Sequence, residues 1–306
     1  MQRIASRRRF LKNTALASLA FTTSSFEFKK YQPNLSFSTL GCPDWTFDGI
    51  IKFAAGNGFS GIEIRGIQRQ LDLSQCPEFS TKANIATTKK KIADNGLHIV
   101  NLGSSASMHL PDGADRDKSI DEARRFIDLA NEINCPYIRV FPNNLPKDVD
   151  KNITIEQISK GLRTLGDYAK GSSVTVLMET HGDLVHVDDI IAVMNYTQHS
   201  GVALVWDIVN MWSVTKEPVA DVYARLKNYV RHTHIKDLRV LDGKDKYMLL
   251  GEGETPIFEA IDLLAKEKYN GYFSFEWEKL WHPEIDAPEI AIADYSKKMK
   301  AHFAVS

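Results

Sequence analysis

Residues 174–207 read VTVLMETHGDLVHVDDIIAVMNYTQHSGVALVWD, and this stretch decides the predicted fold. It begins with an apolar run that ends in Glu179, continues through a segment with helical spacing near 187–198, and ends in a second apolar run that closes with Asp207. A strand, a helix and a second strand in this order imply parallel pairing, because parallel neighbours need a crossover connection. The stretch is therefore one unit of an α/β fold.

The same alternation extends to both sides of this unit. We expect strands near 35–40, 61–65, 98–102, 137–141, 174–179, 203–207, 230–235 and 272–276. We expect helices near 47–57, 82–95, 118–133, 155–170, 187–198, 217–227, 257–266 and 288–303. Eight such units in about 270 residues predict a single-domain (β/α)8 TIM barrel. The alternative is an open doubly wound sheet, but no G-x-G-x-x-G sequence follows any strand, which disfavours its nucleotide-binding version.

The N-terminal segment has the pattern of an export signal. The sequence SRRRFLK at 6–12 precedes an Ala-rich apolar run at 14–21, and paired arginines before Phe-Leu-Lys match the twin-arginine pattern. We assign 1–30 to a twin-arginine signal peptide and 31–306 to the barrel. The alternative for 1–30 is a basic amphipathic helix. This predicts a periplasmic protein, or one anchored to the membrane at its periplasmic face. No apolar run is long enough to predict a transmembrane span.

The composition restricts the partners. Outside 1–30 the chain has 31 Lys and Arg against 38 Asp and Glu, a net charge of −7. A nucleic-acid-binding protein would be expected to carry a basic stripe, so this acidic body suits a small neutral ligand or a cation instead. Assembly into a homo-oligomer stays open. Cys42, Cys76 and Cys135 are too widely spaced for a CxxC site, which leaves one disulfide or three buried free thiols.

In a barrel of this kind, the chemistry is carried by side chains at the C-terminal ends of the strands. Four such residues close the last four apolar strands: Glu179, Asp207, His234 and Glu276. Successive strands are neighbours, so these side chains can converge, and three close carboxylates repel one another unless a cation neutralises them. Three oxygens and one nitrogen suit one divalent ion such as Mn, Co or Mg, or Zn with expanded coordination. Taken singly, each residue is as readily a cap, loop or core residue.

Two coordination positions of such an ion would stay open, as a bidentate hydroxy-ketone requires. The ion would stabilise the enediolate formed when the C–H between carbonyl and hydroxyl loses its proton. Glu179 and Glu276 are the expected catalytic acid–base residues, one on each side of the substrate. Return of the proton to the other face gives epimerisation, return to the adjacent carbon gives isomerisation, and loss of a β-substituent gives elimination.

Further polar residues at the same strand ends are expected to bind substrate oxygens. They are Glu63, Arg65, His109, Arg139, His181, Asn210, His232 and Lys236. An ion pair explains Arg139 or Lys236 equally well. His232 and His234 are two residues apart on one strand, so both can face inward and either can be the imidazole ligand.

Several motifs resemble the sugar phosphate isomerase/epimerase family of the xylose isomerase-like TIM barrel superfamily, which also includes endonuclease IV. They are METHGD (178–183), WDIVN (206–210), HTHIKD (232–237), LLGEGETP (249–256) and FEWEKLWHPEID (275–286). The resemblance implies that one divalent metal is bound by Glu179, Asp207, His234 and Glu276, and it favours His234 over His232. Asn210 departs from the family pattern, because similar epimerases and the endonuclease branch carry a His there. This departure argues against the three-metal cluster of that branch.

Together these features predict a metal-dependent sugar isomerase or epimerase that acts on a free or oxidised sugar or a cyclitol. A phosphorylated substrate is disfavoured, because the protein is expected to be exported and has no Gly-rich phosphate-binding loop. One alternative is a metal-dependent lyase or dehydratase acting on a keto-sugar or keto-glycoside. The others are a non-catalytic sugar-binding barrel and an endonuclease IV-like phosphodiesterase.

Overall fold

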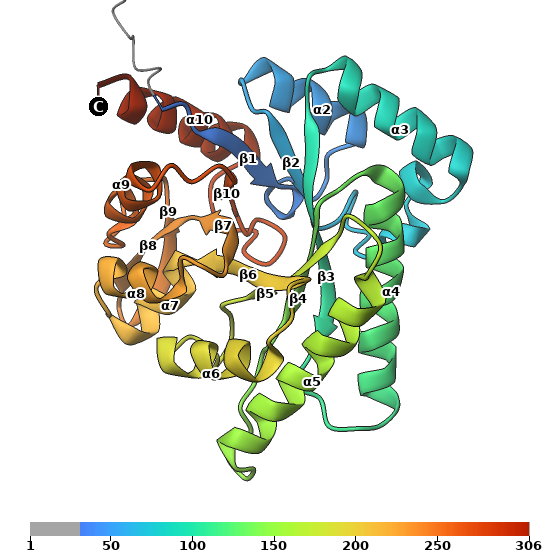
Figure 1. The fold of residues 1–306 in the computed structure, drawn as a ribbon. Coiled ribbons are helices and arrows are strands. Elements are labelled where there is room, and N and C mark those ends of the chain that lie inside the picture. Colours follow the sequence, from blue (N-terminus) through green and yellow to red (C-terminus); the bar gives the residue numbers. More distant parts are fainter. Residues whose placement is uncertain (1–30, 306) are drawn as a thin grey trace, which may run out of the picture. The chain divides into compact units, whose positions relative to one another are not determined.

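The computed structural model describes residues 31–305, and the expected export signal at 1–30 lies outside them. Eight parallel strands close into a barrel in the order β1-β10-β7-β6-β5-β4-β3-β2, surrounded by helices (Figure 1). This confirms the predicted TIM barrel. The strands are β1 (Asn34–Ser38), β2 (Gly61–Ile64), β3 (His98–Ser107), β4 (Tyr137–Phe141), β5 (Thr175–Glu179), β6 (Val202–Asp207), β7 (Val230–Ile235) and β10 (Tyr272–Phe275).

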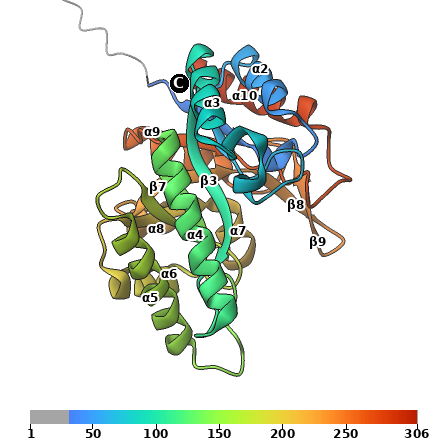
Figure 2. The ribbon, with the colours of Figure 1, turned by 90° about the vertical axis from the view of Figure 1, so that its right-hand side faces the viewer.

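The helices lie between these strands, with one more after the last. They are α2 (Phe47–Gly56), α3 (Lys82–Asp94), α4 (Ala114–Ile133), α5 (Lys151–Ala169), α6 (Val187–Thr197), α7 (Ile208–Thr215), α8 (Val219–Leu226), α9 (Ile257–Lys266) and α10 (Pro288–Val305). Short 3-10 helices occupy Thr39–Gly41, Leu73–Gln75 and Pro77–Phe79. Figure 2 shows the long helix α4 running alongside β3.

Parallel pairing places the C-terminal ends of the barrel strands on one rim. Across β6 and β7, Asp207 pairs with His234, and across β7 and β10, His234 pairs with Ser274. The barrel closes where β1 pairs with β10, for example at Phe37 and Phe275. Because every barrel strand runs in the same direction, the residues that end the strands face a common opening.

The barrel and its helices are held together by apolar packing. Leu177, Ala203 and Val205 form a buried cluster on β5 and β6, and Tyr137 packs against it. Helix α10 is attached to β10 through Tyr295, whose ring stacks on Phe275 with centroids 4.6 Å apart. Burying aromatic rings of this size accounts for much of the energy that fixes a helix to a sheet.

A hairpin that we did not predict stands between β7 and α9. Its antiparallel strands are β8 (Asp237–Leu241) and β9 (Lys244–Met248), and it projects from the barrel in Figure 2. Its turn residues Asp242 and Gly243 have φ values of +53° and +72°, as a tight hairpin turn requires. Most of its side chains are exposed, so its sequence lacks the apolar alternation that signals a half-buried strand.

The base of the hairpin is fastened by one buried carboxylate. Asp237 accepts hydrogen bonds from the backbone N–H groups of Leu238, Gly251, Gly253 and Thr255, at 2.9–3.3 Å. Position 253 must be glycine, because a Cβ there would collide with the Asp237 carboxylate. The LLGEGETP motif is therefore a backbone cradle for Asp237.

Several predicted boundaries were wrong. Strand β3 continues to Ser107 instead of ending at Leu102, so Ser104 and Ser105 lie within the strand and not in a loop. Helix α4 begins at Ala114 rather than at 118, because its polar first turn carries no apolar signal. The helix expected at 217–227 is preceded by a separate helix, α7, and the chain between α7 and α8 includes Lys216, with φ of +52°.

Two simpler expectations can be compared directly with the structure. All three cysteines are buried free thiols. Burial raises the pKa of Cys76 to about 11 and that of Cys135 to about 12. Within residues 31–305, no helix combines the length and apolar character that a membrane crossing requires.

Candidate metal and active site

Four strands that are adjacent in the barrel place the predicted ligand set at one point. Glu179 ends β5, Asp207 ends β6, His234 lies in β7, and Glu276 directly follows β10. One candidate ligand atom from each lies within 4.8 Å of all the others. His234 Nδ1 is 3.4 Å from Glu179 Oε1, 3.7 Å from Asp207 Oδ2 and 3.2 Å from Glu276 Oε1. All four side chains are buried.

Local structure determines which oxygen of Asp207 faces the cluster. Asp207 caps the N-terminus of α7, and its Oδ1 accepts the backbone N–H of Asn210 at 2.8 Å. The hydroxyl of Thr180 bonds the backbone of Asp207, accepting from its N–H at 3.0 Å and donating to its carbonyl at 3.2 Å. With Oδ1 engaged in capping, Oδ2 is left to face His234 and Lys236.

Two buried cations flank the cluster on opposite sides. Arg139 Nε lies 3.0 Å from Glu179 Oε2, and its guanidinium also donates to the carbonyl of Ser104 at 2.9 Å. Lys236 Nζ lies 2.8 Å from Asp207 Oδ2 and 2.7 Å from Glu276 Oε2. The outer oxygen of each catalytic candidate is thus held by a different cation.

Sequence reasoning missed one acidic member of the site. Glu278 Oε1 lies 2.7 Å from Lys236 Nζ, and Tyr247 from the hairpin lies beside Trp277 and His282 in the same region. Burial raises the pKa of Tyr247 above its ordinary range. The E-x-E spacing of Glu276 and Glu278 was a signal that both could face one side, but the position of the hairpin could not be foreseen.

The charges of the cluster leave a deficit of positive charge. Glu179, Asp207, Glu276 and Glu278 carry four negative charges in contact with Arg139, Lys236 and His234, which supply three positive charges when the imidazole is protonated. Glu63 adds a fifth negative charge on the Nε2 side of His234. A buried site of this kind strongly favours an added cation.

The pKa directions point the same way. Burial by itself would lower the pKa of His234, but Glu276, Glu63 and Glu179 raise it well above its ordinary value. Burial would raise the pKa of Glu276, but His234 and Lys236 hold it well below its usual range. Burial likewise opposes ionisation of Glu179, and His234 and Arg139 outweigh it, so its pKa is lowered. The same field that would retain a proton on His234 would attract a metal ion.

The donor atoms also fit a metal. His234 Nδ1 is buried and forms no hydrogen bond within residues 31–305, although three carboxylate oxygens lie 3.2–3.7 Å from it. Buried polar atoms without partners are rare, and they indicate a missing ion, a strained group or a catalytic one. The set of three carboxylates and one imidazole is the donor chemistry of a six-coordinate divalent ion.

Asn210, His181 and Arg65, three of the predicted substrate-binding residues, lie at the barrel rim. The Asn210 amide lies 3.5 Å from Glu179 Oε1. His181 is half-buried, and its Nδ1 is 3.0 Å from Asn143 Oδ1. Arg65 donates to Ser105 Oγ at 2.8 Å, and burial lowers its pKa to about 10.

Three other residues that were expected to contact substrate are His109, Arg139 and Lys236. His109 is half-buried in the chain segment after β3, and burial lowers its pKa. Arg139 and Lys236 form the ion pairs described above, which sequence reasoning had left as the alternative to substrate binding. Both are nearly fully buried.

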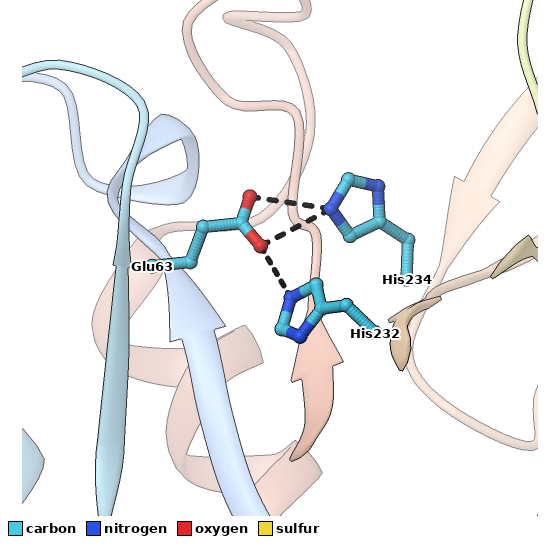
Figure 3. A group of neighbouring side chains, drawn as sticks. All are labelled: Glu63, His232 and His234. Carbon is cyan, nitrogen blue, oxygen red and sulfur yellow. Dashed lines mark hydrogen bonds and ion pairs between the residues drawn. The ribbon is translucent and has the colours of Figure 1, made fainter. Parts of the chain in front are cut away.

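Two of the residues expected to contact substrate engage protein side chains instead. Glu63 and His232 are 0% exposed, and they lie against His234 inside the barrel (Figure 3). His232 Nε2 is 2.7 Å from Glu63 Oε2, so the two side chains engage each other. Burial would raise the pKa of Glu63, but His234 and His232 hold it well below its usual range. In this structure both residues therefore contact protein side chains.

Comparisons with known proteins agree with this architecture. A family model described as xylose isomerase-like TIM barrel matches residues 51–298. The 3-dehydroshikimate dehydratase of Bacillus anthracis is 25% identical over 248 residues, covering 76% of this chain and 85% of that protein. The fructoselysine 3-epimerase of Shigella flexneri is 24% identical over 247 residues, covering 78% of this chain and 87% of that protein. Related proteins thus include epimerases and a dehydratase.

Solved structures show the same fold. A xylose isomerase-like TIM barrel protein from Mycobacterium smegmatis, in complex with magnesium, superimposes with a TM-score of 0.66 at 19% identity. The match covers 89% of this chain and 97% of that one. This likeness shows a shared fold. The cluster of Glu179, Asp207, His234 and Glu276 is by its geometry one that could hold a metal ion.

Proposed function

The chain belongs to the xylose isomerase-like TIM barrel family, and on that premise we propose that it is a divalent-metal-dependent enzyme of carbohydrate chemistry. Its reaction is proton transfer at the carbon beside a carbonyl group, which makes it an epimerase or isomerase. The substrate is a free or oxidised sugar or a cyclitol. The observation that carries this proposal is the convergence of Glu179, Asp207, His234 and Glu276 at one buried point of the barrel rim.

Those four residues would hold one divalent ion. Their donor atoms are compatible with Mn, Co, Mg or Zn. When bound, the ion would polarise the substrate carbonyl and so acidify the neighbouring C–H bond. The remaining chemistry falls to side chains of the protein.

The two glutamates differ in the cation that each one faces. Glu179 is paired with Arg139, which does not release a proton at any physiological pH. Glu276 is paired with Lys236, an ammonium group that carries protons. Burial would lower the pKa of Lys236, but Asp207, Glu276 and Glu278 raise it well above its ordinary value, so Lys236 holds its proton beside Glu276. We therefore assign proton removal to Glu179 on one face and proton return to Glu276, with Lys236 beside it, on the other. This asymmetry supports an epimerase, because the two faces of the substrate carbon meet different partners.

Elimination is the second candidate, and one observation favours it. Lys236 Nζ lies between Glu276 and Glu278, at 2.7 Å from each, so it is positioned to donate a proton to a departing hydroxyl group. The similarity to a 3-dehydroshikimate dehydratase also supports a lyase acting on a keto-sugar or keto-glycoside. Both reactions share the first step, removal of the proton beside the carbonyl.

The test follows solvent deuterium. The full chain, loaded with Mn²⁺ in heavy water, is given a panel of keto-sugars, oxidised glycosides and cyclitol ketones, and the products are analysed by NMR and mass spectrometry. Deuterium on the carbon beside the carbonyl is expected, and the same assay separates an epimer from an eliminated product. An epimer or isomer formed without solvent deuterium would indicate hydride transfer and remove the acid–base roles, whereas an eliminated product is recognised by its lost hydroxyl group and need carry no deuterium. The Glu276→Gln variant is expected to lose turnover by at least ~100-fold.

Two further parts of the proposal rest on sequence. Residues 6–12 support export through the twin-arginine pathway, with the barrel of 31–306 working in the periplasm or anchored at its periplasmic membrane face. The net charge of −7 outside 1–30 supports a small carbohydrate partner rather than nucleic acid. Asn210, in place of a fifth ligand-type residue, supports one metal ion rather than a cluster.

A further inference from the structure

A buried polar cluster lies beneath the candidate metal ligands. Glu63 from β2 lies against His232 and His234 from β7 (Figure 3), and Ser274 from β10 completes the cluster. Glu63 Oε2 is 2.7 Å from His232 Nε2 and 3.1 Å from His234 Nε2, and Glu63 Oε1 is 3.2 Å from His234 Nε2. The hydroxyl of Ser274 donates to Glu63 Oε2 at 3.3 Å. All four side chains are 0% exposed.

The spacing within this cluster suits protons rather than a second metal ion. Two ligands that each lie about 2.1 Å from an ion at a tetrahedral angle are roughly 3.4 Å apart. The nitrogen–oxygen separations of 2.7–3.2 Å are instead those of hydrogen bonds. Glu63 therefore accepts N–H groups from both imidazoles.

An ionised carboxylate can only accept, so each histidine must carry its proton on Nε2. For His234 this has a direct consequence at the other side of the ring. In the neutral ring, Nδ1 is then the nitrogen whose lone pair is free, and Nδ1 is the atom that faces Glu179, Asp207 and Glu276. The orientation that exposes Nδ1 to the ligand set is the one in which Nε2 points at Glu63.

We propose that Glu63 is a positioning residue that fixes the Nε2–H tautomer of His234 and thereby presents Nδ1 to the metal ion. This inference rests on the proposed function. Glu63 belongs to β2, on the far side of β1 and β10 from β7, so it bonds across the barrel interior rather than along the sheet. Glu63 contacts the His234 ring at Nε2, while the three carboxylates of the ligand set surround Nδ1 on the other side of the ring.

His232 has a supporting part in the same arrangement. It donates to the oxygen of Glu63 that also accepts from His234, and together with Ser274 it restrains the rotation of the carboxylate. Its own Nδ1 has no hydrogen-bond partner within residues 31–305, so the contact with Glu63 is what orients the ring. This explains two buried histidines at alternate positions of one strand when only one of them can reach the ligand set.

The variant Glu63→Gln tests the proposal because glutamine has nearly the same side-chain shape as glutamate but carries a donating NH₂ group in place of one accepting oxygen. A glutamine offers one accepting oxygen and one donating NH₂ group, so a donor now faces the Nε2–H of His234 if the NH₂ group takes the place of Oε1, and faces both imidazoles if it takes the place of Oε2. We expect Mn²⁺ affinity, measured by calorimetry on the full chain, to fall about 10–100-fold, the usual effect of losing a partner behind a metal-bound histidine. Ser274→Ala removes a neutral donor from the same carboxylate and should change the affinity less than threefold.

Imidazole ¹⁵N NMR reports the tautomer directly, with His234→Gln identifying the resonances. Wild-type chain, with Zn²⁺ and without it, is expected to show a hydrogen-bonded proton on His234 Nε2. A bare Nε2 with the proton on Nδ1 would overturn the inference, whatever the metal affinity and whether or not Glu63→Gln folds. Equal Mn²⁺ affinity of wild type and Glu63→Gln would also overturn it. Wild type that binds no divalent ion but keeps the Nε2 proton would instead contradict the proposed function.

Discussion

The buried pair of Arg139 and Glu179 allows a prediction that needs no substrate. Arg139→Met removes the cation beside Glu179, and the side chains of both residues are only 2% exposed. Removing one partner of a buried ion pair costs about 3–5 kcal/mol, because the remaining charge is uncompensated. Loss of the hydrogen bond to the Ser104 carbonyl adds about 1 kcal/mol. We expect the metal-free variant to lose about 4–6 kcal/mol of unfolding free energy, a large part of the stability of an ordinary domain.

A divalent ion should restore part of this loss, because it neutralises the same carboxylate. Ligand at 100 times its dissociation constant stabilises a protein by about 2.7 kcal/mol. Urea unfolding of the variant, followed by circular dichroism in EDTA and in excess Mn²⁺, should therefore show a metal-dependent gain at least as large as that of wild type. The control is Arg69→Met, since Arg69 forms an exposed, solvent-screened pair with Asp44 whose loss should change the stability little.

The reasoning would be refuted if Arg139→Met were no more destabilising than Arg69→Met. It would also fail if adding Glu179→Gln to Arg139→Met caused a further additive loss. When both members of a pair are removed, the second change should cost less than it does alone, because the uncompensated charge is gone.

Four other outcomes are expected. The purified chain should carry about one divalent ion, and three zinc ions per chain by elemental analysis would instead indicate the endonuclease branch. Asp207→Ala should lose most of this metal, whereas Glu276→Gln should retain much of it, because an amide oxygen can still coordinate; atomic absorption after dialysis separates the two. Metal binding near neutral pH should release protons, because the raised pKa of His234 leaves that ring protonated before the ion arrives, and calorimetry in buffers of different ionisation enthalpy will detect them. Changing Arg7 and Arg8 together to Lys should leave the protein in the cytoplasm, and normal export of this double variant, seen by cell fractionation, would contradict the twin-arginine assignment.

The barrel could be predicted from the sequence because its signal is local and repeated. Each unit is an apolar run followed by a helical segment, as in 174–198, and eight repetitions leave few alternative folds. The approach of Glu179, Asp207 and His234 could be predicted for a related reason. Strands that follow one another along the chain are neighbours in such a barrel, so residues at their ends must meet.

The contacts that sequence reasoning missed or misread cross the barrel or come from loops. Glu63 bonds His232 and His234 from the opposite side of β1 and β10, more than 160 positions away in the chain, and no local pattern records such a contact. Expecting Glu63 to bind substrate was reasonable from its strand, but its orientation toward His234 depends on packing in three dimensions. Glu278 and Tyr247 were missed because a loop and a polar hairpin carry them.

The hairpin of β8 and β9 has a fixed base beside the candidate active site and a tip that lies away from it. Its base is locked by the four backbone hydrogen bonds to Asp237, immediately beside Lys236, whereas its tip at Asp242 and Gly243 is far along the strands from that lock. Mutations at the tip can therefore accumulate without moving Lys236 or the carboxylates that it contacts. The hairpin tip is therefore the part of this segment in which length and sequence can vary while the reaction centre stays unchanged.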